Sequence, residues 1–307
     1  MNLASRHPSA RQYISDLAAR GRYDFSPREV QSELGVSADA VKLALNRLSK
    51  QKLIASPSRG FWVIVPPEYR SLGCPPADQF IPALMTRLKL PYYVGLLSAA
   101  QYYGAAHQRP QALSVVLAKN RPPIHCGMVR VDFVARKRVA EVPRESFNTP
   151  RGALQVSSPE ATALDLVGYA EHAGGLNQVA TVLSELAEKI DAEKLAAAAE
   201  TTPVPWAQRL GYLLDHLGLS AKTGALKAYV RKHARVSADL LPKAPRARAR
   251  RNKDWRLYVN GKVIELLPGV HGKRDRLRQS GFLAGAASSK RTWFAGARAC
   301  GKSPAAG

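Results

Sequence analysis

A segment near the N-terminus carries side chains of the kinds that recognise bases in DNA. In the run SADAVKLALNRLSK, residues 37–50, apolar residues recur at helical spacing and would face a core. The positions between them then point outward. An Asn can pair bidentately with adenine, Lys or Arg can contact guanine or phosphate, and Leu can pack on a thymine methyl. The residues predicted to contact DNA are Ser37, Asp39, Lys42, Leu43, Asn46, Arg47, Lys50 and, at the tip of a following hairpin, Arg59.

The alternative for this face is a polar, solvated surface of a small helical domain, because charge on the outside of a helix is common. A second alternative is catalysis. An acidic residue in a strand with a lysine after it, as in Asp132 and Lys137, is typical of Mg²⁺-dependent nucleases. Ala135 stands where the second carboxylate would be, which favours a structural role for Asp132. No catalytic residue, metal ligand or cofactor is predicted.

Capping signals and turns define three helices and a hairpin around the predicted DNA-binding face. Residues 9–21 form an amphipathic run, and Ser26 and Glu29 make a capping box that starts a second helix. Gly35 and Ser37 mark the turn into a third helix, expected to continue to residue 52. Two strand-like runs, 53–56 and 61–65, follow with residues 57–60 between them. This order is the outline of a winged helix-turn-helix, predicted over residues 9–66.

A proline-rich linker leads to an α/β region, predicted over residues 77–267. Strands are expected at 113–117 and 129–134, and Asn260-Gly261 predicts a hairpin over 256–266. Helices are expected around 84–88, within 92–103 and at 161–170, 176–190, 192–200, 206–217 and 221–232. The fold class is therefore predicted to be α+β, an N-terminal winged helix-turn-helix joined to an α/β domain with a helical C-terminal part.

Charge favours a polyanionic partner. The chain has 46 Lys and Arg against 23 Asp and Glu, a net charge of +23. Residues 268–307 hold 8 basic and 1 acidic residues and show little periodicity, so they are interpreted as a basic, disordered tail. No signal peptide or membrane span is visible, and a cytoplasmic location is expected. The three cysteines, Cys74, Cys126 and Cys300, lie far apart in the sequence, and no disulfide scaffold is predicted.

Several motifs taken together resemble the AbiEi-type antitoxin family, the regulator half of abortive-infection toxin–antitoxin pairs. They are YYVGLLSAA at 92–100, GAAHQ at 104–108 and SSPEATALDLV at 157–167, with a weaker fit at WRLYVN, residues 255–260. The resemblance extends from about Tyr13 to Leu266 and includes the predicted N-terminal domain. It implies autorepression of a two-gene operon by that domain. It also implies a C-terminal domain that counteracts a toxin with a nucleotidyltransferase fold.

The expected function is thus that of an antitoxin and transcriptional autorepressor, not an enzyme. Its expected partners are double-stranded operator DNA and a nucleotidyltransferase-like toxin, without a membrane. Two alternatives remain open. One is an orphan winged-helix transcription factor with a sensing domain, and the other is a Mg²⁺-dependent nucleic-acid-processing enzyme that uses Asp132.

Overall fold

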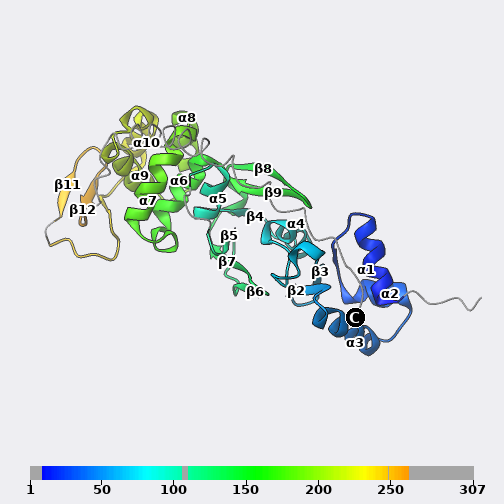
Figure 1. The fold of residues 1–307 in the computed structure, drawn as a ribbon. Coiled ribbons are helices and arrows are strands. Elements are labelled where there is room, and N and C mark those ends of the chain that lie inside the picture. The colour runs from blue at the N-terminus through cyan, green and yellow to red at the C-terminus, as the bar shows by residue number, and fades with distance from the viewer. Residues whose placement is uncertain (1–8, 106–109, 248, 263–307) are drawn as a thin grey trace, which may run out of the picture. The chain divides into compact units, whose positions relative to one another are not determined.

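The N-terminal part of the chain contains three helices and a small antiparallel sheet (Figure 1). The computed structural model describes residues 9–105, 110–247 and 249–262. The elements are α1 (Ala10–Ala19), β1 (Asp24–Phe25), α2 (Pro27–Leu34), α3 (Ala38–Lys50), β2 (Ile54–Ser58), β3 (Phe61–Ile64) and a 3-10 turn at Pro67–Tyr69. The strands are ordered β1-β3-β2, and both pairings are antiparallel.

The predicted capping residues begin these helices. The Ser26 hydroxyl accepts a hydrogen bond from Glu29 N at 3.2 Å, and the Glu29 carboxylate accepts one from Ser26 N at 2.6 Å. This reciprocal pair confirms the capping box. The strand β1 was not predicted. In addition, α3 ends at Lys50, two residues before the expected end, and the hairpin turn is shorter than expected because Pro57 and Ser58 belong to β2.

A six-stranded mixed sheet forms the centre of the following region. After α4 (Ala77–Leu88) come β4 (Tyr92–Val94), β5 (Leu113–Leu117), β6 (Ile124–Cys126), β7 (Val129–Ala135), β8 (Arg144–Thr149) and β9 (Gly152–Ser157), with a 3-10 turn at Val139–Glu141. The strand order is β6-β7-β5-β4-β9-β8. The pairs β5–β7 and β4–β9 are parallel and the other three are antiparallel. Of the six strands, β5 and β7 lie where the sequence predicted them, whereas β6 and β8 were missed.

Alternate residues of the central strands point to opposite faces of this sheet. Tyr93, Val116 and Val134 lie opposite one another on β4, β5 and β7, and they belong to the core shared with the later helices. Val94 and Val115 belong instead to the core shared with α4. The same α4-side core includes apolar residues of β2 and β3, among them Phe61. Arg136 comes two residues after Val134, so its side chain is directed toward the helical face.

Six further helices cover that face and extend beyond it (Figure 1). They are α5 (Leu96–Tyr102), α6 (Pro159–Gly168), α7 (Leu176–Leu186), α8 (Ala192–Ala199), α9 (Val204–His216) and α10 (Gly224–His233), with 3-10 turns at Ala170–Ala173, Ala187–Lys189 and Ser220–Lys222. All residues of α6 from Pro159 to Val167 are buried. This burial follows from its contacts with α5, α7, α8 and α9. The mixed content of helices and strands confirms the α+β fold class.

The C-terminal hairpin predicted through Asn260-Gly261 is wrong. The last strands are β10 (Ala238–Asp239), β11 (Arg250–Asn252) and β12 (Leu257–Val259), and β12 pairs with β10 on one edge and β11 on the other. Both edges of β12 are therefore occupied. Asn260 instead stabilises a turn. Its side-chain amide accepts a hydrogen bond from Leu241 N at 2.9 Å and donates hydrogen bonds to Leu241 O and Ala244 O. The predicted second strand and the basic tail lie outside the described residues, apart from Lys262.

Candidate functional site

The helix α3 is fixed by a tight turn before it and by an apolar inner face. Gly35 has φ +62° at the end of α2, a left-handed conformation that glycine adopts without strain. The Ser37 hydroxyl then accepts a hydrogen bond from Ala40 N at 3.3 Å and caps the first turn of α3. Val41 and Leu45 are each 2% exposed and pack in the N-terminal core. These contacts hold the opposite face of α3 outward.

All eight residues predicted to contact DNA are exposed. Seven lie on α3 or at its N-cap, and the eighth lies in the β2–β3 turn; they are Ser37, Asp39, Lys42, Leu43, Asn46, Arg47, Lys50 and Arg59. Leu43 is 58% exposed. Within the described chain, the polar side chains of this set other than Ser37 have no hydrogen-bond or ion-pair partner. A ligand could bind them without breaking an internal contact.

The charges of this face suit a nucleic acid better at some positions than at others. Lys42, Arg47 and Lys50 offer cations to phosphate or to guanine. Asp39 lies in the first turn of α3, where its carboxylate stabilises the positive end of the helix dipole. A carboxylate repels phosphate but can accept a hydrogen bond from cytosine N4. Asp39 therefore has a structural role that needs no DNA contact.

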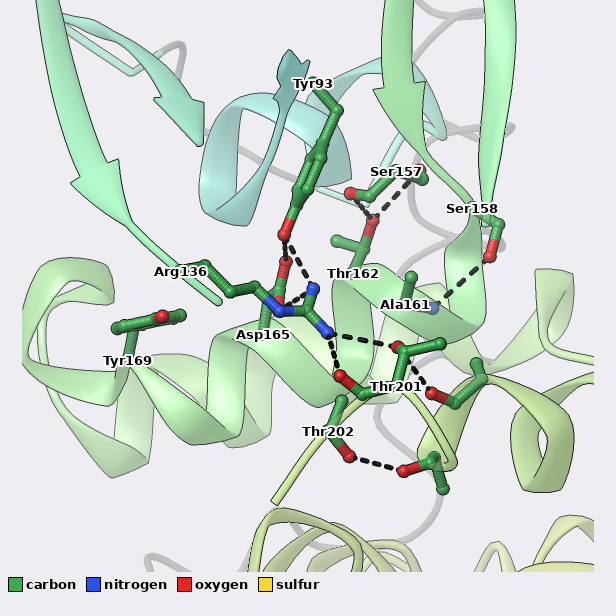
Figure 2. Close-up of polar contacts among 12 residues, drawn as sticks. Tyr93, Arg136, Ser157, Ser158, Ala161, Thr162, Asp165, Tyr169, Thr201 and Thr202 are labelled. Atoms are coloured by element: carbon green, nitrogen blue, oxygen red, sulfur yellow. Dashed lines mark hydrogen bonds and ion pairs between the residues drawn. The ribbon is translucent and has the colours of Figure 1, made fainter. Parts of the chain in front are cut away.

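A second cluster, of one tyrosine and two charged residues, is buried between the six-stranded sheet and α6 (Figure 2); it consists of Tyr93, Arg136 and Asp165. The Arg136 guanidinium lies 2.8 Å from an Asp165 carboxylate oxygen. The Tyr93 hydroxyl donates to the other carboxylate oxygen at 2.7 Å and accepts from Arg136 at 2.6 Å. The side chains of Arg136 and Asp165 are 3% and 0% exposed. We call these three residues the buried triad.

Desolvation and pairing act in opposite directions on the triad. Burial raises the pKa of Asp165 to about 6, while Arg136 and the Tyr93 hydroxyl oppose that rise. Burial also raises the pKa of Tyr93, with the Asp165 carboxylate adding to the effect. Burial is the largest single influence on the pKa of Arg136 and lowers it, but Asp165 and Tyr93 together outweigh burial and the net shift is upward. The arrangement is a neutralised ion pair, with Tyr93 protonated at physiological pH.

Arg136 also ties the sheet to the helical part. Its second guanidinium nitrogen donates to the carbonyl and hydroxyl oxygens of Thr201, at 3.2 and 3.1 Å (Figure 2). The guanidinium carbon lies 5.6 Å from the centre of the Trp206 ring, a cation–π distance. Because solvent does not reach the triad, a substrate has no access to it. We conclude that the triad positions β4, β7 and α6 rather than acting on a ligand.

The start of α6 is held by a neighbouring polar set. The Ser158 hydroxyl accepts a hydrogen bond from Ala161 N at 3.3 Å and donates one to the Glu160 carboxylate at 2.8 Å. The Glu160 carboxylate in turn accepts from Asp191 N at 3.0 Å, directly before α8. The motif at 157–167 therefore sets both the start of α6 and the approach of α8.

Comparison with known proteins identifies the segment that contains the triad. Residues 93–216 match the family model described as the AbiEi antitoxin C-terminal domain. This match supports a resemblance of the segment to the AbiEi-type antitoxin family. The resemblance inferred from the sequence is thus confirmed for these residues. No curated protein matches the chain.

A solved structure shares the fold over more of the chain. The RV2827C protein from Mycobacterium tuberculosis aligns with a TM-score of 0.58 at 19% identity. The alignment covers 81% of this chain and 90% of that protein. At this identity the likeness establishes a common fold alone.

The AbiEi segment contains the complete triad, together with Thr201 and Trp206. Sequence reasoning quoted Asp165 only within a motif and did not single out Arg136. A signal was present, because an Asp inside the apolar run ATALDLV must find a partner once the helix is buried. The identity of that partner depended on the strand register, which the sequence did not reveal.

The structure gives no support to a metal site at Asp132. This residue is exposed on β7 opposite Ser114. Among the described residues no group of three or more His, Cys, Asp or Glu side chains could hold a metal ion. No helix in the described part of the chain is long and apolar enough to cross a membrane.

Two surface grooves lie away from both the α3 face and the triad. The larger, about 660 Å³, is lined by residues of several elements, including Tyr69, Leu72, Tyr102, Met128 and Arg130. The smaller, about 210 Å³, includes Arg151, whose guanidinium lies over the Tyr23 ring. Neither groove is lined by a residue of α3.

Proposed function

We propose that this protein is an antitoxin that also represses transcription of its own operon. In this proposal α3 and the β2–β3 hairpin bind double-stranded operator DNA. The AbiEi segment, which gives the chain its antitoxin assignment, counteracts a nucleotidyltransferase-like toxin. The DNA-binding half rests on the N-terminal geometry, and the choice of toxin rests on the family resemblance.

The N-terminal element order supports a winged helix-turn-helix. The helices α2 and α3 are joined by a turn of three residues, Gly35 to Ser37, and the β2–β3 hairpin follows directly. In this motif the second helix of the pair enters the major groove, and its N-terminal residues contact base edges. The hairpin forms the wing. Arg59 and Gly60 make its turn, which suits contact with phosphate or the minor groove.

The observation that carries the DNA-binding proposal is the unpaired, outward face of α3. Its centre is Leu43, and Lys42, Asn46 and Arg47 lie on the same exposed surface. A thymine methyl would provide an apolar contact for the exposed Leu43 side chain. We assign base contacts to Lys42, Leu43 and Asn46. We assign backbone contacts to Arg47, Lys50, Arg59 and the N-terminus of α3, with Ser37 and Asp39 fixing that end.

The antitoxin half needs no catalytic group. The AbiEi segment has an internally paired triad and contributes most of a large buried core, and its folded surface is available to a partner. Its partner is expected to be encoded beside it.

Titration of single variants on DNA tests the DNA-binding proposal. Asn46→Ala should weaken binding to the protein's own promoter by about 1–3 kcal/mol and relax specificity at one base pair. Arg59→Ala should weaken binding to promoter and scrambled DNA alike, because phosphate contacts carry no sequence information. Arg20→Ala is the matched control, since Arg20 is exposed, basic and outside the predicted face. If Asn46→Ala and Arg59→Ala both match the control in affinity and specificity, the assigned face does not bind DNA.

A further inference from the structure

Two glycine-containing segments, residues 72–74 and 126–128, run antiparallel and in contact. Met128 N donates a hydrogen bond to Leu72 O at 2.8 Å. Next to this bond, a methyl group placed on Gly127 would lie 2.1 Å from Leu72 O and 3.0 Å from Gly73 Cα. Glycine at 127 is therefore required for this approach, and its φ of +58° adds to that requirement.

The register of these segments brings two cysteines together. Since Leu72 faces Met128 and Gly73 faces Gly127, Cys74 faces Cys126. The contact between Gly73 and Gly127 brings the two backbones close together beside these cysteines, and a disulfide spans Cα atoms about 4.4–6.8 Å apart. Both thiols are free and close enough to hydrogen-bond to each other. The distance of these cysteines along the sequence concealed this pairing.

The two thiols differ in environment. Cys74 is 0% exposed and Cys126 is 7% exposed. The hydrogen bond from the Cys74 thiol lowers the pKa of Cys126, and a backbone N–H of Ser56 adds to this effect. The same hydrogen bond and burial raise the pKa of Cys74. Cys126 is thus the better nucleophile, and Cys74 is placed to react with it afterwards.

We propose that Cys74 and Cys126 are a reversible redox pair that a hydroperoxide converts into a disulfide. In the first step the Cys126 sulfur attacks hydrogen peroxide, the O–O bond breaks, and a sulfenic acid and one water form. In the second step the Cys74 sulfur attacks the Cys126 sulfur, the S–S bond forms and the S–O bond breaks. The leaving hydroxide takes the Cys74 proton as a second water. The two sulfurs lose two electrons in total, and both peroxide oxygens are reduced.

The disulfide would join two parts of the fold that are now held by non-covalent contacts. Cys74 lies in the segment that links β3 to α4, and Cys126 ends β6 at the β6–β7 turn. The bond would close a loop of roughly 50 residues, a length for which cross-linking restricts the unfolded chain strongly. This inference does not rest on the proposed DNA binding or on the toxin.

Mass spectrometry of the full-length protein after peroxide treatment tests the proposal. The reduced protein is treated with a small excess of hydrogen peroxide, quenched with an alkylating agent and digested. Before alkylation we expect an intact mass lower by two hydrogen atoms, and after digestion one cross-linked peptide containing Cys74 and Cys126, with full reversal by dithiothreitol. The oxidised form should also unfold at a temperature roughly 5–10 °C higher than the reduced form.

Cysteine variants distinguish a disulfide between Cys74 and Cys126 from oxidation of Cys300 or of a single cysteine. Cys300→Ser should still form the cross-link, whereas Cys74→Ser should leave Cys126 as a sulfenic acid that a dimedone probe captures. Because Cys74→Ser could disturb a buried site, the wild-type result decides independently of it. The proposal is overturned if Cys74 and Cys126 stay reduced in wild type while Cys300 oxidises. It is equally overturned if Cys126 proceeds to sulfinic acid without cross-linking.

Discussion

The α3 face and the buried triad use similar side chains in opposite ways. On α3, Lys42 and Asn46 are exposed and have no partner within the described chain. In the triad, Arg136 and Asp165 are sealed from solvent and form an ion pair with each other. An unpaired charge in water costs little free energy and remains available for a ligand. A buried charge, in contrast, is stable only when its partner is present. This difference is the reason why we propose a binding role for the first region and assign the second to the fold.

Removal of Arg136 should produce the largest effect on stability. Arg136→Ala leaves the Asp165 carboxylate buried without its partner and should lower the free energy of unfolding by about 3–5 kcal/mol. The control is Arg138→Ala, two residues further on, whose ion pair with Glu141 and hydrogen bond to the Glu200 carbonyl are both exposed. That variant should unfold at nearly the wild-type urea concentration. Equal urea midpoints for the two variants would mean that the triad does not stabilise the AbiEi segment.

The pH dependence of stability sharpens the description of the triad. Burial raises the pKa of Asp165 to about 6 in the folded protein, above a value near 3.9 in an unfolded chain. The folded state therefore holds this proton more tightly. The stability contributed in this way is complete below about pH 4 and is lost as pH rises through 6.

The measurement for Asp165 is a series of urea titrations between pH 4 and pH 7. Wild type should lose on the order of 1–3 kcal/mol relative to Asp165→Asn across this interval, since only wild type releases the proton. A difference between the two proteins that stays constant with pH would contradict a raised pKa at Asp165.

The smallest expected effect is on promoter affinity, and a comparison of two leucines of α3 tests it. Leu43 is 58% exposed and Leu45 is 2% exposed. Leu43→Ala should change stability by less than about 0.5 kcal/mol and weaken promoter binding by roughly 1 kcal/mol. Leu45→Ala should instead cost about 2–5 kcal/mol of stability, because it leaves a cavity in the N-terminal core. Thermal unfolding and a fluorescence-anisotropy titration provide the two values. If a folded Leu43→Ala protein binds the promoter with unchanged affinity, Leu43 is not part of the DNA-binding face.

The sequence predicted those features of the fold that depend on residues close together in the chain. The capping box at Ser26, the turn at Gly35 and the inner face of α3 all depend on neighbours within a few residues, and all three are present. The strand β1 exists because Asp24 and Phe25 pair with Val63 and Trp62, which local pattern does not indicate. The same limit explains the incorrect C-terminal hairpin, where distant strands occupy both edges of β12.

The candidate sites divide along the same line. The eight residues of the predicted DNA-binding face were found from helical periodicity and turn signals alone. The triad required the alignment of β4, β5 and β7, which sets Tyr93 across from Val116 and Val134 and directs Arg136 to the same face. The cysteine pair likewise depends on contact between segments far apart in the sequence. A boundary between residues 66 and 77, drawn from composition, stays a prediction.

The central claim is that DNA binding and antitoxin action belong to separate regions of this chain. The most direct measurement uses the full-length double variant Lys42→Ala, Asn46→Ala, expressed with the toxin encoded beside it and with a promoter reporter in the same cells. We predict that the promoter is derepressed while growth protection equals that of wild type. If the double variant still represses the promoter, the assignment of the α3 face as the DNA-binding surface is contradicted. Loss of protection by a folded and abundant variant would contradict the separation of the two functions.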